Sequence, residues 1–481
     1  MSYRNFNDIS KMLSEFFSAF GKIILSEEIR SAIRKKPTDF IRKFKFPWFD
    51  VLLYLIFRHE KCTQSELSTY YATIGKREFR ISKQAAFKAI KKVNPAVFQL
   101  LIRKFVELFY RSSLVKTYKG YILLAEDGTT NELTATEESL SKFGFSQNQH
   151  VKTSEDAHKA TSRSSALYDV TNGIIVDFRM EEFNKSEIPI AIEQLRSSYN
   201  LFNTRKVIFL ADRYYPSVEL FALLETYGFN YCIRAKSNFF KKQIADMKSD
   251  DEWITVTLDN AWLKRLKYDE SKEWFGRNPT IRIRVVRQKY TYFDESGEQK
   301  TAELIYFTNL SKEEFSKQDI IILYSRRWDL EVSYKTLKTD YEWERFFSSE
   351  CDSEMCSIYA KVVFHNIVGV VRKELNHFFE NDNSGKDHKY SFVVNITQLA
   401  KLMREYGILR YIRSRNRKAI SRIMDLIYEM RHKIKVPVRP NRHNKRWGRI
   451  VTTNSPTRFR LDGRNWPKVV NKKGTLMTVK P

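Results

Sequence analysis

Hydrophobic positions in residues 1 to about 115 follow a helical spacing. An apolar stretch at Trp48–Phe57 predicts one helix, and Thr63 is a plausible N-cap for the next. After a turn around Gly75, Ser82 is a second plausible N-cap, in front of Lys-Gln-Ala-Ala-Phe-Lys-Ala-Ile. The pattern therefore predicts a helical N-terminal region that contains two short helices joined by a turn.

From Gly120 onward the pattern changes to short apolar runs bounded by turn residues, which predict strands. These runs cover 121–125, 166–170, 174–180, 207–211 and 231–235. Thr171-Asn172-Gly173 indicates a hairpin between the second and third runs. Helices are predicted after Ser186 and over 218–227. This order of elements predicts a mixed α/β sheet.

A further change of pattern begins at about residue 238. Strands are predicted at 253–258, 281–292 and 304–310, with a turn at Asp294–Gly297, and together they indicate a β-rich insertion. The stretch from Ser316 to about Lys338 is predicted as one helix. Three more helices are predicted near 360–375, 396–406 and 419–430.

The charge of the chain indicates a polyanionic partner. In 481 residues, 84 Lys and Arg face 57 Asp and Glu, which gives a net charge of +27. Beyond Tyr411 we count 20 basic and 3 acidic residues, a concentration that suits a tail held along phosphates. An acidic membrane surface is the competing partner, but the longest apolar stretch, Phe46 to Phe57, is shorter than the roughly 20 residues that span a bilayer.

Several classes of protein lack their required residues. The four cysteines are scattered without a CxxC pair, which argues against a zinc ribbon or a disulfide framework and indicates a reducing cytoplasm. We see no secretory signal and no phosphate loop, so we expect no nucleotide cofactor. A tyrosine recombinase would need a tyrosine nucleophile downstream of the pattern His443-x-x-Arg446. The last tyrosine in the sequence is Tyr428, before that pattern, so this class is excluded. A two-histidine nickase would need His-x-His, which is absent.

The predicted helix after Ser82 carries Lys83, Gln84, Lys88 and Lys91. Two short helices with a basic second helix suit a helix-turn-helix on DNA, with Lys83 and Lys88 as contacts. The alternative is a helical bundle with a solvated basic face.

Three carboxylates are candidates for the chemistry of phosphodiester cleavage. Asp127 and Asp212 each end an apolar strand, and Glu331 lies within a predicted helix. Two Mg²⁺ ions held by carboxylate oxygens can neutralise charge on the attacking and leaving oxygens of such a reaction. Taken singly, each residue has an ordinary explanation, because Asp after a strand is often a turn residue and a helical Glu is often solvated or ion-paired.

The neighbours of Glu331 strengthen the case. Residues Tyr324, Arg327, Glu331, Lys335 and Lys338 advance by three or four, so on one helix they would share a face. Such a face would carry a phenol, a guanidinium, a carboxylate and two ammonium groups. This combination suits a surface that binds a metal ion and contacts phosphates. The alternative is an exposed helix with an Arg327–Glu331 ion pair.

The spacing Tyr324-x2-Arg327-x3-Glu331-x6-Lys338 resembles the signature of the insertion sequence 4 family of DDE transposases. Asp127-Gly-Thr resembles the first acidic motif of that family, and Asp212-Arg213-x-Tyr215 resembles its second. The resemblance covers about 120 to 340, including the long interval that houses the family's β insertion. One position departs from the pattern, because Tyr214 stands where the family usually has Gly.

The resemblance implies a catalytic core of the RNase H-like type. Asp127, Asp212 and Glu331 would bind two Mg²⁺ ions, with Mn²⁺ as a substitute, while Tyr324, Arg327 and Lys338 contact phosphates. Lys335 and Arg213, beside these residues in the two motifs, are further DNA-contact candidates. An activated water would free a 3′-OH, which then attacks target DNA. Relatives that form a DNA hairpin hold a flipped base on a tryptophan of the insertion, and the candidates here are Trp253, Trp262 and Trp274.

These observations together predict five segments. They are a helical DNA-binding region (1–115), a first part of an RNase H-like core (116–237), a β-rich insertion (238–312), a second part of the core with the catalytic helix (313–345), and a basic helical C-terminal region (346–481). We expect a cut-and-paste DNA transposase that acts on double-stranded DNA as a homodimer in a bacterial cytoplasm, associated with the nucleoid when bound. The alternatives are an RNase H-like nuclease without joining activity and a non-catalytic DNA-binding regulator.

Overall fold

The computed structural model describes residues 6–42, 45–59, 63–147, 151–293, 298–382, 390–405, 408, 412, 425–439, 468–470 and 476–478. The chain divides into two compact units. The helical unit comprises residues 1–114, 131–162 and 335–481, and the sheet unit comprises residues 115–130 and 163–334. The predicted turn at Asp294–Gly297 and most of the basic tail beyond Tyr411 lie outside the described residues.

The helical unit is built mainly from helices. Its N-terminal helices are α1 (Phe6–Ile24), α2 (Glu27–Ala32), α3 (Trp48–Phe57), α4 (Thr63–Thr73), α5 (Lys83–Ile90) and α6 (Ala96–Arg111). Its later elements are α7 (Glu137–Phe143), η1 (Thr336–Asp340), α15 (Cys351–Asp382), β9 (Phe392–Val394), α16 (Ile396–Glu405), α19 (Arg431–Ile434), β10 (Lys435–Pro437), β11 (Lys468–Val470) and β12 (Leu476–Thr478). The predicted cap of α5 is confirmed, because the Ser82 hydroxyl accepts a hydrogen bond from the Ala85 N–H.

Aromatic side chains hold the first helices of this unit together. The rings of Phe16 and Phe20 on α1 meet the ring of Phe105 on α6 edge to face, with centroids 5.2 and 4.9 Å apart. Such pairs add about 1 kcal/mol each to the burial of their surface. The apolar spacing that predicts helices here therefore corresponds to a packed interior.

Helix α15 forms much of the core of the helical unit. Its stretch Cys351–Phe379 is, within the described ranges, the one long and apolar enough to cross a membrane, and that window is buried inside the protein. The core helix of a folded protein meets the same criteria, so this stretch is weak evidence for a span. The prediction that Phe46–Phe57 is the longest apolar stretch is wrong, because Cys351–Phe379 is longer. Polar residues interrupt this stretch of α15, so the sequence does not show it as one apolar run.

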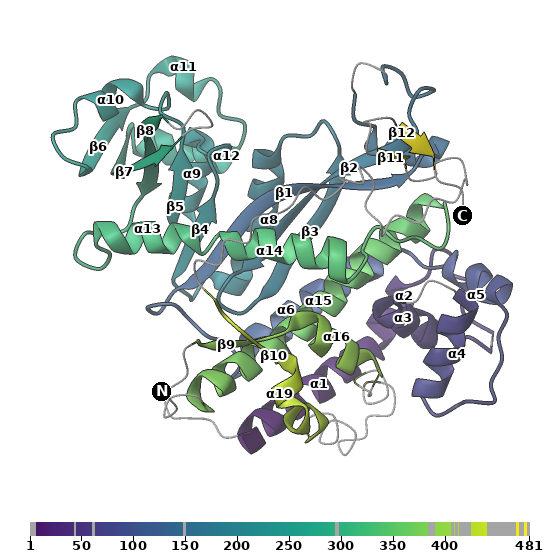
Figure 1. Cartoon of the computed structure of the whole chain (residues 1–481). Coiled ribbons are helices and arrows are strands. Elements are labelled where there is room, and N and C mark those ends of the chain that lie inside the picture. The colour runs from purple at the N-terminus through teal and green to yellow at the C-terminus, as the bar shows by residue number, and fades with distance from the viewer. Residues whose placement is uncertain are drawn as a thin grey trace. The chain divides into compact units, whose positions relative to one another are not determined.

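The sheet unit is built on a mixed sheet of eight strands in the order β3-β2-β1-β4-β5-β8-β7-β6 (Figure 1). The strands are β1 (Ile122–Thr134), β2 (Lys159–Asp169), β3 (Ile174–Glu182), β4 (Val207–Ala211), β5 (Asn230–Ala235), β6 (Asp251–Thr257), β7 (Thr280–Phe293) and β8 (Gln299–Thr308). Its helices are α8 (Glu187–Phe202), α9 (Val218–Thr226), α10 (Lys241–Ala245), α11 (Asn260–Leu263), α12 (Asp269–Arg277), α13 (Lys317–Ser325) and α14 (Trp328–Lys335). Strands β1 and β2 each continue into the helical unit, and α14 ends there.

The centre of this sheet is parallel. β4 pairs in parallel with both β1 and β5, and all five residues of β4 are buried. Parallel strands are usually covered on both faces, so they appear in the sequence as continuous apolar runs, as Val207–Ala211 does. β5, β8, β7 and β6 then pair antiparallel, which joins the strands of residues 251–308 to the same sheet.

The predicted hairpin between β2 and β3 is confirmed. Gly173 has φ = 71°, the left-handed conformation that the Asn-Gly pattern favours. The Asn172 amide donates hydrogen bonds to the Asp169 carboxylate (2.6 Å) and to the Lys116 carbonyl (3.0 Å). The hairpin is thus tied to the segment that leads into β1.

A buried arginine fixes the start of α13. Arg284 on β7 is fully buried and forms an ion pair with Asp251 on β6 (2.7 Å). Its Nη1 also donates to the carbonyls of Leu310 (3.1 Å) and Phe315 (2.7 Å), just before α13. Pairing and full hydrogen bonding make burial of this charge tolerable and hold the approach to α13 against the sheet.

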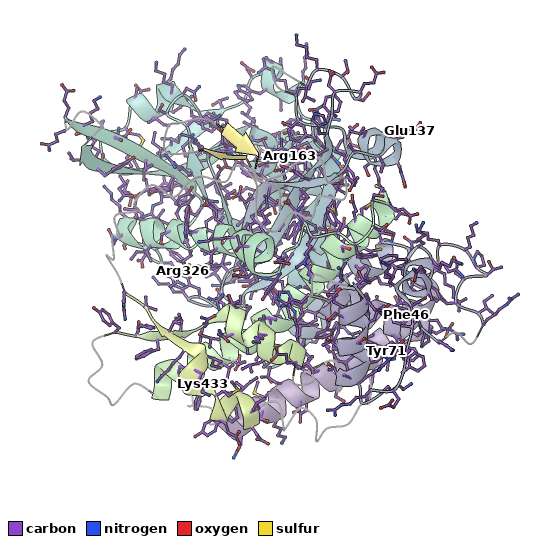
Figure 2. The ribbon with its side chains drawn as sticks, turned by 45° about the vertical axis from the view of Figure 1, so that its right-hand side comes forward. Phe46, Tyr71, Glu137, Arg163, Arg326 and Lys433 are labelled. Carbon is purple, nitrogen blue, oxygen red and sulfur yellow. The ribbon has the colours of Figure 1, made fainter. Side chains whose placement is uncertain are left out.

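The prediction of one continuous helix from Ser316 to Lys338 is wrong. α13 ends at Ser325 and α14 begins at Trp328, and the π-helix η1 follows α14. At the break, Arg327 N–H donates to the Tyr324 carbonyl (3.0 Å), a three-residue step in place of the four-residue step of an α-helix. Arg326, labelled in Figure 2, lies at this break. Residues before and after it therefore do not follow one regular helical face.

Candidate active site

Two of the predicted carboxylates come from adjacent parallel strands in matching register. Ala125 on β1 pairs with Leu210 on β4, and Asp127 and Asp212 each follow two residues later. Asp212 follows the last residue of β4, whereas β1 continues through Asp127 to Thr134, so the prediction that Asp127 ends its strand is wrong. Both aspartates nevertheless lie at the same level, at the edge where β4 leaves the sheet. Side chains at such an edge, where polypeptide leaves the sheet, commonly line a crevice.

Arg327 connects two of the three predicted carboxylates. Its Nη1 lies 3.1 Å from Asp127 Oδ2, and its Nη2 lies 2.5 Å from Glu331 Oε1. Its side chain is only 11% exposed, so these ion pairs are largely shielded from water. Burial lowers the pKa of Arg327, but Tyr324 and the carboxylates of Glu331 and Asp127 raise it by more, which keeps the guanidinium charged. The sequence-based Arg327–Glu331 pair is thus present, but as part of a bridge to Asp127.

The pKa of Asp127 is raised, mainly by burial. Burial raises the pKa of Asp127 to about 6, and the nearby charges of Asp212 and Glu187 raise it as well. Arg327 and the Gly128 N–H, which donates to Asp127 Oδ1 at 3.0 Å, act in the opposite direction. Asp212 is therefore close enough to Asp127 for their charges to interact.

Glu187 is a fourth carboxylate at this place, and it was not predicted. It is the first residue of α8, and its carboxylate accepts hydrogen bonds from Arg163 Nη1 (3.1 Å) and Tyr215 Oη (3.1 Å). A Cβ atom added at Gly128 would overlap this carboxylate. An acidic residue in the first turn of a helix is usually explained by the helix dipole, so the sequence offers no signal that singles out Glu187.

Buried side chains next to Asp127 fix the backbone that carries it. Glu126 is fully buried, which raises its pKa well above the usual range and favours the protonated form. The Ser165 hydroxyl donates to Glu126, and the Tyr334 hydroxyl donates to the Asp127 carbonyl at 2.7 Å. These contacts fix the middle of β1, around Asp127, through side chains from β2 and α14.

The carboxylates at this site are of the type that binds a hard divalent cation, but among the described residues their arrangement does not form a metal site. Asp127, Asp212, Glu187 and Glu331 supply carboxylate oxygens, and their ion pairs among the described residues involve only Arg163 and Arg327. Oxygen donors with uncompensated negative charge are the ligands that Mg²⁺ prefers. No three His, Cys, Asp or Glu side chains in the described ranges are close enough to one another to form a metal site, and Arg327 bridges Asp127 and Glu331. Arg327 would have to move for Asp127 and Glu331 to share a cation.

Two further predicted residues belong to this neighbourhood. The Tyr324 ring centroid lies 5.8 Å from Arg327 Cζ and 5.0 Å from the Tyr306 ring. Arg213, directly after Asp212, is exposed. Lys335 is exposed at the end of α14 and Lys338 lies in η1, and both belong to the helical unit.

The three predicted tryptophans are half-buried on separate elements. Trp253 lies on β6 with Arg282 Cζ 4.8 Å from its ring, Trp262 lies on α11, and Trp274 on α12 meets Phe275 edge to face at 4.8 Å.

A basic groove runs beside α5 in the helical unit. It has a volume of about 730 Å³, and its charged lining residues are Lys45, Arg80, Lys88, Lys91 and Lys92. Among the described residues, no acidic side chain lines it. Lys83 and Lys88 are both exposed on α5, and Lys88 lines the groove. The groove thus gives the predicted DNA-binding helix a concave, positive surface.

Comparison with protein families shows what kind of chain carries this site. Residues 119–367, just over half of the chain, match the family described as "Transposase DDE domain". The chain belongs to this transposase family. The matched range includes Asp127 on β1, Asp212 directly after β4 and Glu331 on α14.

Two individual proteins are similar to this transposase-family chain at a distance. The transposase for insertion sequence element IS231C of Bacillus thuringiensis subsp. berliner is 25% identical over 141 residues. That match covers 24% of this chain and only 29% of the relative's length. The cryo-EM structure of a piggyBac transposase synaptic complex with hairpin DNA matches with a TM-score of 0.38 and 12% identity, over 84% of each chain.

Proposed function

We propose that this chain is a DNA transposase that cuts the ends of an insertion element and joins them to target DNA. Asp127, Asp212 and Glu331 are its catalytic residues in this proposal. The observation that carries it is the β1–β4 register, which brings two aspartates to one edge of the sheet, together with the Arg327 bridge from Asp127 to Glu331. Membership of the DDE transposase family supports the same residues.

The reaction consists of two phosphodiester substitutions. A water molecule first attacks the phosphodiester at the element's end and frees a 3′-OH. That 3′-OH then attacks a phosphodiester of the target, which breaks one bond and forms another without an external energy source. This balance agrees with the absence of a nucleotide-binding phosphate loop from the sequence.

The carboxylates of the site would hold divalent metal ions. Asp127, Asp212 and Glu331 would bind two Mg²⁺ ions, with Mn²⁺ as a substitute, and Glu187 would add negative charge beside them. Such ions neutralise the charge that develops on the attacking and leaving oxygens. Arg327, released from its carboxylates, would then be available to a phosphate oxygen, for which its planar guanidinium is well suited.

Further basic residues would position the DNA. Tyr324, Lys338, Lys335 and Arg213 are the proposed phosphate contacts near the cut, and Lys83 and Lys88 are the proposed contacts of α5. Phosphate contacts of this kind fix the register of a protein on DNA without reading its sequence. Trp253, Trp262 and Trp274 are the proposed positions for a flipped base, if the reaction passes through a DNA hairpin.

The finer classification is also part of the proposal. The spacing from Tyr324 to Lys338 supports the insertion sequence 4 type of DDE transposase. The neighbouring order β3-β2-β1-β4-β5, with β4 parallel to β1 and β5, supports an RNase H-like core, followed by an insertion over 238–312. A homodimer on double-stranded DNA in the bacterial cytoplasm, associated with the nucleoid, completes it.

The test is a transposition assay in cells with a marker flanked by the element's own ends. Wild type is compared with Asp127→Asn and Glu331→Gln, which keep side-chain size and remove charge. Asp329→Asn is the matched control, because Asp329 is an exposed carboxylate on the same helix as Glu331. We expect the first two variants to bind end DNA but not to move the marker, and the control to move it normally.

Other outcomes identify the alternatives. If Asp127→Asn and Glu331→Gln move the marker as wild type does, the proposed catalytic residues are wrong. If purified wild type nicks end DNA in Mg²⁺ and never joins it, the chain is a nuclease without joining activity. Specific binding of the ends with no cutting by wild type would indicate a DNA-binding regulator.

A further inference from the structure

Tyr214 is an exposed aromatic residue on the turn that carries Asp212. Its side chain is 60% exposed, whereas that of the next residue, Tyr215, is fully buried. A large ring left in water beside a site that acts on DNA is a candidate for contact with a nucleobase, because every base offers a flat face for stacking. The exposed ring of Tyr214 is therefore available for contact with a base.

Hydrogen bonds to Asp212 fix the backbone of the turn that carries Tyr214. Tyr214 N–H donates to Asp212 Oδ1 (2.8 Å), and Tyr215 N–H donates to the Asp212 carbonyl (3.2 Å). The buried Tyr215 hydroxyl donates to Glu187 (3.1 Å), which anchors the turn to α8. A ring on an anchored turn loses little conformational freedom when it binds, so more of its contact energy remains for binding.

Positive charge surrounds the same ring. Lys236 Nζ, at the end of β5, lies 4.4 Å from the ring centroid, and Arg213 Cζ lies 5.7 Å from it. Both cations are attracted to the face of the ring in the absence of DNA. A base that stacks on the ring brings its own phosphates, which are stronger partners for a lysine or an arginine than the ring is.

We propose that Tyr214 stacks on an unpaired nucleobase at the DNA end, while Lys236 and Arg213 contact the phosphates beside it. The base must be unpaired or terminal, because the faces of bases inside a duplex are covered by their neighbours. Asp212 lies two residues from Tyr214, so the stacked nucleotide fixes the strand next to the proposed catalytic carboxylates. This inference rests on the proposed function for the presence of a DNA end, and it adds a residue that positions the strand.

The experiment compares two DNA probes with the full chain in EDTA, where no cutting occurs. One probe is a blunt duplex, and the other is the same duplex with a short single-stranded overhang that contains the fluorescent base 2-aminopurine. The variants are Tyr214→Ala and Tyr214→Phe, with Tyr290→Ala as the control, because Tyr290 is an exposed tyrosine (41%) on β7. Thermal unfolding of each variant verifies that it is folded.

We expect Tyr214→Ala to weaken binding of the overhang probe roughly 5- to 100-fold and to relieve the quenching of 2-aminopurine. Binding of the blunt probe should change less than about twofold, since phosphate contacts supply most of its affinity. Tyr214→Phe should retain binding and quenching, because the phenyl ring still stacks. An equal loss on both probes, the same loss for Phe as for Ala, or no loss for Ala would overturn the proposal.

Salt dependence separates the ring from the cations. Lys236→Ala should reduce the slope of log affinity against log salt by about 0.7, the contribution of one phosphate contact on a single strand. Tyr214→Ala should leave that slope unchanged, because stacking releases no counterion. A slope that changes for Tyr214→Ala would count against stacking.

The two proposals fail in different ways. The binding assay needs no catalysis, so Asp127→Asn should show the same overhang preference as wild type if stacking is correct. Active transposition with no role for Tyr214 in overhang binding would refute only the stacking. A Tyr214-dependent overhang preference in a chain that neither cuts nor joins DNA would refute only the catalytic proposal.

Discussion

The carboxylate of Glu187, at the start of α8, occupies the space that a Cβ atom at Gly128 would need. Gly128 follows Asp127 on β1, so the contact joins the strand that carries a proposed catalytic aspartate to the helix that carries an unpredicted carboxylate. Glu187 is held in this position by Arg163 and Tyr215. The glycine of the Asp-Gly-Thr motif therefore leaves room for the Glu187 carboxylate in the position where Arg163 and Tyr215 hold it.

Gly128→Ala is expected to destabilise the protein by about 1–3 kcal/mol, because the added methyl group forces Glu187 away from its two partners. The measurement is the free energy of unfolding by chemical denaturation. Gly276→Ala is the matched control, because a Cβ atom added at Gly276 on α12 meets nothing within 4 Å. In a helix that control should be neutral or stabilising by up to about 1 kcal/mol.

A Gly128→Ala protein as stable as the Gly276→Ala control would show that Glu187 moves aside without cost. In that case the close contact would not explain the glycine. Loss of DNA cutting in such a stable variant would instead indicate that the position of Asp127 or Glu187 matters for activity alone.

Arg327→Lys is expected to reduce strand cutting by about 10- to 100-fold, although the positive charge is kept. In the proposed active state Arg327 leaves Asp127 and Glu331 and contacts a phosphate through its planar guanidinium, and one lysine ammonium cannot reproduce this paired contact. The measurement is the rate of cutting of end DNA by purified protein. Arg277→Lys is the control, because Arg277 on α12 is 81% exposed and its ion pair with Glu273 is long, at 4.0 Å. Full activity of Arg327→Lys would mean that charge alone is required.

The sequence predicts the parts of the site that rest on local patterns. Asp127 and Asp212 end apolar runs that could only be buried strands, and the structure places those strands side by side in register. Glu331 is found through the spacing of its neighbours. Glu187 is not found, because its importance comes from a contact with Gly128, 59 positions earlier in the chain, and its place in a first helical turn looks ordinary.

The errors in the fold predicted from the sequence have similar physical causes. No Gly or Pro lies at the break between α13 and α14, so the sequence pattern from Ser316 to Lys338 predicts one helix. The length of α15 is underestimated, because polar residues such as Glu354 and Lys361 are buried within it by tertiary contacts. Local pattern cannot show a polar group that is satisfied by a distant partner.

Glu354 gives a prediction about the pH dependence of stability. Its carboxylate on α15 accepts hydrogen bonds from Thr134 N–H (3.0 Å) and Thr134 Oγ1 (2.5 Å), at the far end of β1. Burial raises the pKa of Glu354 from 4.5 to about 7, against the effect of these two bonds. Between these pH values the folded protein therefore binds a proton that the unfolded chain has released.

The contribution of Glu354 to stability is thus complete below about pH 4.5 and is lost as the pH rises through about 7, by up to about 3 kcal/mol. Glu354→Gln should remove this slope, since glutamine does not ionise and its one amide oxygen can accept from Thr134 N–H and Oγ1, as Oε1 of Glu354 does. The measurement is the free energy of unfolding across this pH range. Glu405→Gln, an exposed carboxylate on α16, is the control and should keep the wild-type slope. A wild-type slope in Glu354→Gln would assign the pH dependence to another group.

The basic groove beside α5 gives a prediction about salt. If Arg80 and Lys88, which line it, contact DNA phosphates, the double variant Arg80→Ala/Lys88→Ala should bind duplex DNA more weakly. It should also reduce the slope of log affinity against log salt by about 1.8, or about 0.9 for each phosphate that is no longer neutralised. Arg30→Ala is the control, because Arg30 on α2 pairs with Glu27 at 3.1 Å and does not line the groove. Weaker binding with an unchanged slope would mean that the groove contributes shape and not phosphate contacts, and unchanged binding would place the DNA elsewhere on the protein.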